Sequence, residues 1–158
     1  MALMLSTSAF PAGGGIPSQY TCDGADVSPA LAWAGTPAGT ASYALIADDP
    51  DAPGGTWVHW VLFDLPGTLA ALPEGVPKTD RLPDLGGALQ GRNDFRRIGY
   101  GGPCPPPGRP HRYFFKLYAL DAALPLKAGA TKQDVERAMR GHVLAESSLM
   151  GTYARARR

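Results

Sequence analysis

Two histidines of this sequence stand near residues that could share a small ligand pocket with them. The first, His59, lies in an apolar run and closely follows the turn DDPDAP (48–53). That turn contains two candidate carboxylates, Asp49 and Asp51, together with Ala52. Taken alone, the turn fits the ordinary use of Asp and Pro, and His59 fits a hydrogen-bonded core histidine. Taken together, an imidazole and a carboxylate near one strand end form a candidate binding group.

The second histidine follows a loop whose composition gives it a fixed shape. The loop GGPCPPPGRP (101–110) contains five prolines and three glycines, and His111 comes directly after it. Proline fixes φ and removes a backbone donor, while glycine permits turns and close backbone approach. Tyr113 lies two residues beyond His111, so both side chains share one face of the expected strand. The loop itself supplies three further candidate site residues: Gly101, Gly102 and Pro103.

These groups favour a small and partly charged ligand. Two imidazoles can donate N–H bonds near neutral pH, and the backbone N–H groups of Gly101 and Gly102 could form an anion-binding concavity. A carboxylate in the same pocket opposes a bare dianion because like charges repel. It suits a protonated phosphate, or a zwitterion whose ammonium meets Asp49 or Asp51. The residues therefore predict a site for phosphate or a phosphoethanolamine-like group, with no cofactor.

Two enzymatic alternatives use the same residues. A metal-assisted hydrolase would take its ligands from His59, His111, Asp49 and Asp51, but the sequence has no HxxxH or HxH pairing. A thiol hydrolase would use Cys104, which is flanked by prolines and has no recognisable oxyanion donors. The motifs GxSxG, GxxxxGK[ST] and GxGxxG are absent. The sequence favours a non-enzymatic binding protein, with either hydrolase, or an interaction protein with a vestigial pocket, as the alternative.

Composition and charge fit one globular domain over residues 1–158. Hydrophobic residues make up 44% of the chain and charged residues 18%, and the length suffices for a core. The net charge of +1 predicts no general attraction to nucleic acid or to an anionic membrane surface. The start MALMLSTSAF lacks the basic region of a signal peptide, and no run approaches the ~20 apolar residues of a membrane span. We therefore expect a cytoplasmic protein without integral membrane contact.

The expected cytoplasmic location also predicts the redox state of the two cysteines. Cytoplasmic proteins keep their thiols reduced, so we expect Cys22 and Cys104 to be free. Each lies in a turn-rich motif, TCDG or GPCPP, so the two could still lie near each other. A disulfide is therefore the alternative.

The strand pattern predicts an all-β protein. Short apolar segments alternate with Gly, Pro and Asp clusters, which is typical of sheets with many turns. The main predicted strands are 42–47, 57–65 and 111–121, and the weaker ones are 2–6, 31–35 and 143–155. Segment 57–65 is apolar on both faces and predicts a central strand, whereas 111–121 alternates and buries the face of His111 and Tyr113.

One helix is predicted near the C-terminus. Thr131 fits its N-cap and Asp134 fits the reciprocal capping position. An apolar stripe with helical spacing follows, formed by Val135, Ala138, Met139 and His142. We therefore expect His142 in the core or at its rim.

Residues 66–110 show little regular structure beyond a short strand or turn in LGGALQGRNDF (85–95). A connection of that length is usually functional, unless elements within it are missed. The architecture is predicted to be an antiparallel β-sandwich with one or two short helices.

At these residues the chain resembles a known family. DPDAP (49–53), HW (59–60) and GPCPPPGRPHRY (102–113) running into FFKLYALD (114–121) are similar to the phosphatidylethanolamine-binding proteins, and specifically to their bacterial, Raf-kinase-inhibitor-like branch. Supporting segments are YTCDGADVSPALAW (20–33), LPEGVP (72–77), QGRNDF (90–95) and GHVLAESSLMGTYAR (141–155). The resemblance covers nearly the whole chain.

The resemblance implies a β-sandwich with a small anion-accepting pocket at one end. By motif, the pocket would be lined by Asp49 with its turn, His59, the Gly102–Pro103 loop, His111 and Tyr113. Eukaryotic relatives are linked to phospholipid head-group binding and to restraint of kinases or proteases, so a kinase or protease is a candidate partner, although the resemblance identifies no particular kinase target. Those forms add a C-terminal helix over the pocket, so we expect a more open pocket in this chain. The apolar strands and the resemblance are both compatible with a homodimer.

Overall fold

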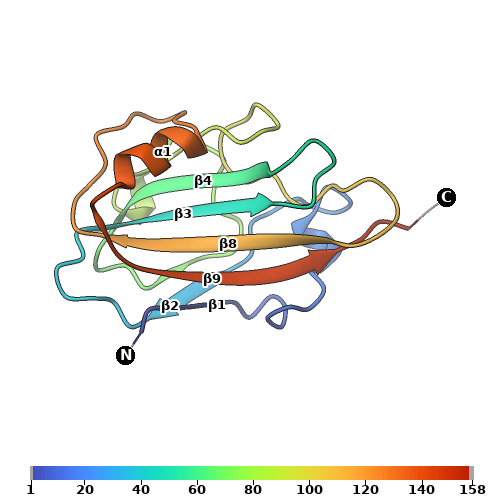
Figure 1. The fold of residues 1–158 in the computed structure, drawn as a ribbon, viewed down its shortest axis with the longest axis horizontal. Helices are drawn as coiled ribbons and strands as arrows, with labels where there is room; N and C mark the ends of the chain where they lie inside the picture. Colours follow the sequence, from blue (N-terminus) through green and yellow to red (C-terminus); the bar gives the residue numbers. More distant parts are fainter. Residues whose placement is uncertain (1, 157–158) are drawn as a thin grey trace.

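The apolar runs of the sequence form two antiparallel sheets (Figure 1). The computed structural model describes residues 2–156, so residues 1 and 157–158 of the predicted domain lie outside the described part. The larger sheet has six strands, in the order β6 (Arg81–Leu82), β7 (Ala88–Gln90), β4 (Trp57–Pro66), β3 (Ser42–Asp49), β8 (His111–Leu120) and β9 (Val143–Tyr153). The smaller sheet has three strands, in the order β1 (Met4–Ser6), β2 (Leu31–Ala34) and β5 (Ala71–Leu72). The predicted antiparallel β-sandwich is confirmed.

The main core lies between the two sheets. Trp33 of β2 packs against Tyr43 of β3, with ring centroids 5.3 Å apart. Leu72 of β5 and Leu117 of β8 belong to the same buried cluster, so both sheets contribute to one apolar layer. On β8 the odd-numbered residues from Tyr113 onward are buried and the even-numbered ones are partly exposed up to Tyr118, as the alternating pattern predicts.

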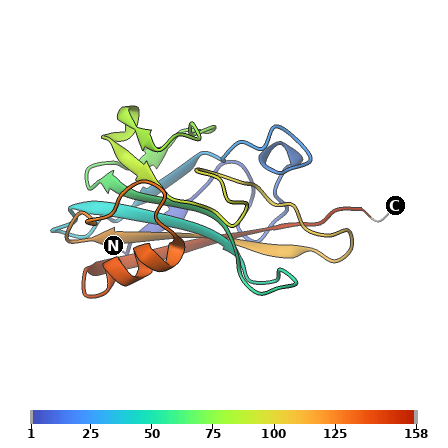
Figure 2. The same cartoon turned by 90° about the horizontal axis from the view of Figure 1, so that it is seen from above.

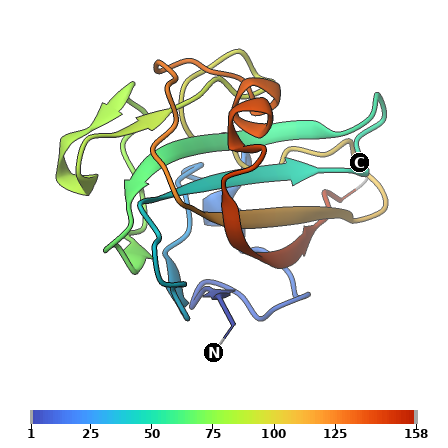
Figure 3. The ribbon, with the colours of Figure 1, turned by 60° about the vertical axis from the view of Figure 1, so that its left-hand side comes forward.

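The other face of the large sheet is covered in part by a helix, α1 (Lys132–Met139), which crosses the strands (Figures 2 and 3). Val135 and Met139 of α1 are buried in a second cluster with Val61 and Phe63 of β4. Strand β4 is therefore covered on both faces, and its residues from Val58 to Phe63 are all buried. This confirms the central strand predicted from residues 57–65.

The predicted capping box of α1 is present. Asp134 N–H donates to Thr131 Oγ1 at 3.2 Å, and Thr131 N–H donates to Asp134 Oδ2 at 3.0 Å. The prediction that His142 continues the buried stripe is wrong, because the helix ends at Met139. Gly141, at φ +82°, then turns the chain, and the His142 side chain is 46% exposed beside Asp121.

Residues 66–110 contain more elements than the sequence pattern indicates. Strands β5, β6 and β7 have only two or three residues each, and a 3₁₀ turn (Pro83–Leu85) joins the last two. Elements that short carry no readable period, so only the expected short strand in 85–95 was recognisable in advance. A second 3₁₀ turn (Ser18–Tyr20) lies near the N-terminus. Among residues 2–156, no helix has the length and apolar character that a membrane crossing requires.

The prediction of free thiols is wrong. Cys22 and Cys104 form a disulfide, with Cα atoms 5.4 Å apart and 82 positions between them in sequence. The fold brings the two turn-rich motifs side by side, which no pattern within either motif could indicate. The disulfide fastens the segment after Ser18–Tyr20 to the proline-rich loop before β8.

Candidate functional site

A pocket of about 150 Å³ opens at the end of the sandwich toward which the arrow of β3 points in Figure 1. At this end β3 finishes, while β4 and β8 begin, because neighbouring strands of the sheet are antiparallel. We call it the histidine pocket. It is lined by Asp49, Ala52, Pro53, Trp57, His59, Phe95, Cys104, Pro105, Pro106, His111 and Tyr113. Five of the nine predicted site residues are therefore brought together here: Asp49, Ala52, His59, His111 and Tyr113.

Asp49 and His111 form a buried pair between β3 and β8. The carboxylate only accepts, so His111 Nδ1 donates to Asp49 Oδ2, at 2.7 Å. Asp49 Oδ1 accepts from the backbone N–H of Asp51 at 2.7 Å, which fixes the carboxylate in the turn. The side chains are 4% and 13% exposed for Asp49 and His111, respectively. With its Nδ1 occupied, His111 has only Nε2 free for a ligand.

His59 is oriented in a similar way, by the backbone of Gly101. Its Nδ1 lies 2.7 Å from the carbonyl oxygen of Gly101, and a carbonyl only accepts, so Nδ1 carries the proton. The pairing is reciprocal, since Gly101 N–H donates to His59 O at 2.9 Å. Burial lowers the pKa of His59, against the opposing effects of its backbone hydrogen bonds and of nearby Asp49. His59 is therefore neutral at pH 7, and its Nε2 presents a lone pair.

Tyr113 lies between the two imidazoles. Its ring meets His59 edge-on at 5.3 Å and stacks on His111 at 6.5 Å, measured between ring centroids. Its buried hydroxyl has no hydrogen-bond partner among residues 2–156. Burial and the negative charge of Asp49 both raise the pKa of Tyr113, so the phenol stays protonated and remains a donor. A buried donor without a partner indicates a position where a ligand or water oxygen fits.

Two aromatic residues complete the wall and were not singled out from the sequence. Trp57 and Phe95 meet edge-on at 5.5 Å, and Phe95 meets His59 at 5.4 Å. Trp57 is 39% exposed and Phe95 is 37% exposed, so both form the rim of the opening. The period of β4 places Trp57 on the same face as His59, a signal that could have found it. Phe95 lies in a long loop and has no such signal.

Asp51 lies outside the histidine pocket. Its carboxylate forms a two-pronged pair with Arg112, through Nε–Oδ2 and Nη2–Oδ1 contacts of 2.9 Å each. Hydrogen bonds from Arg112 lower the pKa of Asp51 to about 2. Asp51 instead lines a neighbouring cavity of about 420 Å³ together with Arg109, Pro110, His111 and Arg112. The expected use of Asp51 to meet a ligand ammonium is therefore disfavoured, because its charge is already paired.

The loop residues Gly101, Gly102 and Pro103 do not line the histidine pocket, and their backbone groups bond to other parts of the fold. The expected anion-binding concavity of their amides is wrong, because Gly101 N–H bonds to His59 O and Gly102 N–H bonds to Asp26 Oδ1 at 2.7 Å. Gly101 and Gly102 line a different cavity, which both cysteines also line. The Pro103 carbonyl accepts from the backbone N–H of Cys22 at 3.1 Å. The contribution of this loop to the pocket is to orient His59.

The structure also bears on the hydrolase alternatives. Cys104 belongs to the disulfide, so the thiol nucleophile of that alternative is absent. Within the described range 2–156, no three His, Cys, Asp or Glu side chains are grouped so as to hold a metal ion. Asp49, the acidic group nearest both imidazoles, has both oxygens engaged in hydrogen bonds.

Comparison with known proteins identifies the family. The family model described as phosphatidylethanolamine-binding protein matches residues 6–154. A UPF0098 protein of Methanothermobacter thermautotrophicus is 56% identical over 151 residues, covering 96% of this chain and 98% of that protein. A UPF0098 protein of Aquifex aeolicus is 50% identical over 149 residues, covering 93% of this chain and 85% of its own.

Two solved structures share the fold over almost the full length. YbcL of E. coli, described as a member of the mammalian PEBP family, has a TM-score of 0.91 at 32% identity and covers 98% of this chain and 99% of its own. CT736 of Chlamydia trachomatis, described as a PEBP homolog, has a TM-score of 0.87 at 39% identity, with 98% of each chain covered. The resemblance stated from the sequence motifs is confirmed, and the chain belongs to the phosphatidylethanolamine-binding protein family.

Proposed function

We propose that this protein is a non-enzymatic binding protein whose histidine pocket takes the phosphate of small phosphorylated or zwitterionic molecules, such as a phosphoethanolamine head group. The observation that carries the proposal is the paired orientation of His59 and His111. Each donates its Nδ1 proton to a fixed protein oxygen, which leaves both Nε2 atoms for a ligand. The unpartnered hydroxyl of Tyr113 adds a third polar group between them.

The protonation of the pocket selects the form of phosphate. The lone pair on His59 Nε2 accepts a hydrogen bond, so it pairs with the P–OH of a phosphate monoanion. Equivalently, a dianion binds together with a proton taken up by His59. The buried charge of Asp49 opposes a second negative charge. Because the second pKa of a phosphate ester is about 6, affinity falls by up to about tenfold per pH unit above that value.

The aromatic rim suits the cationic end of a zwitterion. Trp57 and Phe95 stand exposed at the opening, and an ammonium within ~6 Å of an aromatic face gains electrostatic attraction. This assigns the ammonium to the rim, since the Asp51 carboxylate is occupied by Arg112. The ligand would then lie with phosphate inside and ammonium at the mouth.

Calorimetric titration with O-phosphorylethanolamine at pH 6 and pH 8 tests the proposal. We expect saturable binding of O-phosphorylethanolamine at pH 6 and weaker binding at pH 8. Replacing this ligand with inorganic phosphate at pH 6 should lower the affinity by less than the change from pH 6 to pH 8 does. His142→Ala is a matched control, because His142 is exposed, pairs with Asp121, and lies near the opposite end of β8 from the pocket. Absence of heat at both pH values would refute a head-group pocket.

Partners beyond the small ligand stay predictions. A kinase or protease target and a homodimer are such predictions, and so is a cytoplasmic location. A pull-down with phosphate present and absent would separate a partner that competes for the histidine pocket from one that binds elsewhere.

A further inference from the structure

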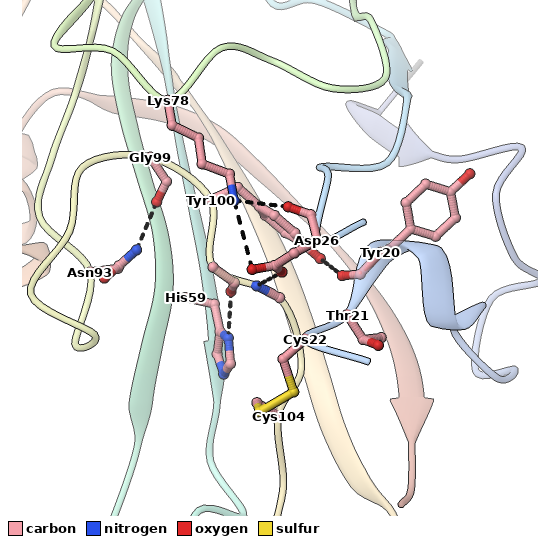
Figure 4. Close-up of polar contacts among 12 residues, drawn as sticks. Tyr20, Thr21, Cys22, Asp26, His59, Lys78, Asn93, Gly99, Tyr100 and Cys104 are labelled. Atoms are coloured by element: carbon pink, nitrogen blue, oxygen red, sulfur yellow. Dashed lines mark hydrogen bonds and ion pairs between the residues drawn. A yellow bond between two sulfur atoms is a disulfide. The ribbon is translucent and has the colours of Figure 1, made fainter. Parts of the chain in front are cut away.

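The disulfide forms part of the wall of the histidine pocket. Cys104 lines that pocket, and both Cys104 and Cys22 line a second cavity of about 310 Å³. Cys104 and Phe95 line both cavities, so the Cys104 end of the disulfide (Figure 4) borders each of them. Both cysteine residues are exposed to solvent, so a small or protein dithiol can reach the bond.

Hydrogen bonds beside the disulfide fasten the same two segments together. The N–H of Gly102 donates to Asp26 Oδ1 at 2.7 Å, and the hydroxyl of Tyr100 donates to Tyr20 O at 2.7 Å. The backbones approach so closely that a Cβ at position 102 would clash with Tyr20 O. Residues 20–26 therefore act as a support for the 100–104 segment.

Asp26 is itself held in an uncommon conformation by a charge partner. Its φ is +59°, a left-handed value that costs free energy for a residue with a side chain. Lys78 donates to the Asp26 carbonyl at 2.8 Å and lies 3.7 Å from its carboxylate (Figure 4). The Asp26 contact with Gly102 thus depends on a locally strained turn close to Cys22, and the covalent tie helps to keep that turn in place.

The fastened segment also orients a pocket histidine. Gly101, next to Gly102, supplies the carbonyl that fixes the proton on His59 Nδ1. A movement of residues 101–104 therefore changes both the position of the wall and the ring orientation of His59. Beyond Pro103 the loop is rich in prolines, which cannot donate backbone bonds, so few hydrogen bonds replace the covalent tie.

We infer that Cys22–Cys104 is a redox site, and that its reduction by a dithiol loosens this wall and weakens ligand binding in the histidine pocket. A reductant thiolate attacks one sulfur and releases the other as a thiolate, giving a mixed disulfide. The second reductant thiol then displaces the remaining cysteine. The protein gains two electrons and two protons as two thiols, and the dithiol leaves as a disulfide. The affinity part of the inference rests on the proposed function.

The expected size of the effect follows from preorganisation. In the oxidised protein the wall is ordered before the ligand arrives, whereas the reduced protein must order it on binding. We expect O-phosphorylethanolamine to bind on the order of tenfold more weakly to the reduced form. The double variant Cys22→Ala/Cys104→Ala should match the reduced wild type and should not respond to reductant.

The test compares oxidised wild type, wild type reduced with dithiothreitol, and the double variant. Calorimetry gives the affinity, and NMR gives the amide signals of Gly101 and Gly102 and the His59 Hδ1 signal without ligand. Far-UV circular dichroism verifies that each form is folded. We expect weaker binding together with shifted or broadened signals in both forms that lack the bond. Equal affinities in the two redox states would overturn the inference.

The NMR arm separates this inference from the proposed function. If the oxidised protein binds no O-phosphorylethanolamine, the proposed function fails, while the free-protein spectra still report on the wall. Changes in the NMR signals of Gly102 and His59 on reduction would then still support redox control of the pocket wall. Unchanged spectra would overturn it regardless of what the pocket binds.

Discussion

Two adjacent buried carboxylates at the end of β3 have opposite roles. Asp48 is 1% exposed and Asp49 is 2% exposed, but alternation along the strand sends them to different faces of the sheet. Asp48 lies on the helix side, paired with Lys116 at 3.1 Å and Lys132 at 2.8 Å. Asp49 lies on the pocket side, paired with His111 at 2.7 Å.

The two carboxylates differ in whether their partners keep a second polar atom that is free to meet a ligand. Lys116 and Lys132 each pair their only charged group, the ammonium, with Asp48. These two ion pairs join β3 to β8 and to the start of α1. A histidine bound through Nδ1 still has Nε2, so the Asp49 pair fixes a group that can meet a ligand. One carboxylate therefore joins elements of the fold, and the other orients an imidazole in the histidine pocket. Each of the following variants tests this difference between the two carboxylates.

The largest expected effect is on stability, at the helix side. Asp48→Ala leaves two partly buried ammonium groups without their counter-charge, and we expect a loss of about 3 kcal/mol in the free energy of unfolding. Binding of O-phosphorylethanolamine by the folded fraction should be unchanged, because the pocket is on the opposite face. Urea unfolding and calorimetry on the same sample measure the two quantities. A large loss of affinity with normal stability would break the contrast.

The pocket side should give the converse result. His111→Ala removes one Nε2 that the proposed function assigns to the phosphate, and we expect affinity to fall by tenfold or more, which is ~1.4 kcal/mol or more. Stability should fall by about 1 kcal/mol, since Asp49 loses one hydrogen bond but keeps the N–H of Asp51. If His111→Ala bound as tightly as wild type, Asp49 would be a structural anchor like Asp48.

The pH dependence of stability isolates His59. Because burial lowers the pKa of His59, the unfolded chain binds a proton at a higher pH than the folded chain does. Stability therefore falls as the pH drops below the ordinary histidine value of about 6.5, by at most about 1.4 kcal/mol per pH unit from this group. In His59→Gln the thermal melting temperature should change less between pH 6.5 and pH 5 than it does in the wild type. An equally steep profile in the variant would assign the acid sensitivity to other groups.

The smallest expected effect is at Tyr113. Tyr113→Phe removes a buried hydroxyl that has no partner among residues 2–156, so stability should change by less than about 0.5 kcal/mol. We expect affinity for O-phosphorylethanolamine to fall by about threefold, the size of one modest hydrogen bond. Unchanged affinity would indicate that the ligand does not reach this hydroxyl, and would limit the polar groups of the pocket to the imidazoles.

Features with a local period were predictable from the sequence. The core strands β3, β4 and β8 follow from apolar runs and alternation, and the capping box of α1 follows from Thr131 and Asp134. The convergence of Asp49 with His111 followed from antiparallel pairing of strands whose ends carry those residues.

Features that depend on distant segments were not predictable. The disulfide joins positions 82 apart, and Phe95 reaches the pocket from a long loop without a readable period. The amides of Gly101 and Gly102 looked free in the sequence because their acceptors, on β4 and at Asp26, are remote. His142 left the helical stripe because Gly141 ended the helical path one residue earlier. For the disulfide, Phe95 and the two amides, tertiary contacts decided the outcome over the local pattern, whereas the end of the helix was decided locally at Gly141.

The most direct test of the central claim is a long-range ¹H–¹⁵N spectrum of the three histidine rings, recorded while O-phosphorylethanolamine is added at pH 6.5. Our account predicts that the Nε2 signals of His59 and His111 shift along one saturation curve. The His142 signals, from the exposed pair with Asp121, should stay in place. If His142 shifted in parallel with the other two, or if His59 and His111 did not respond, the histidine pocket would not be the phosphate site.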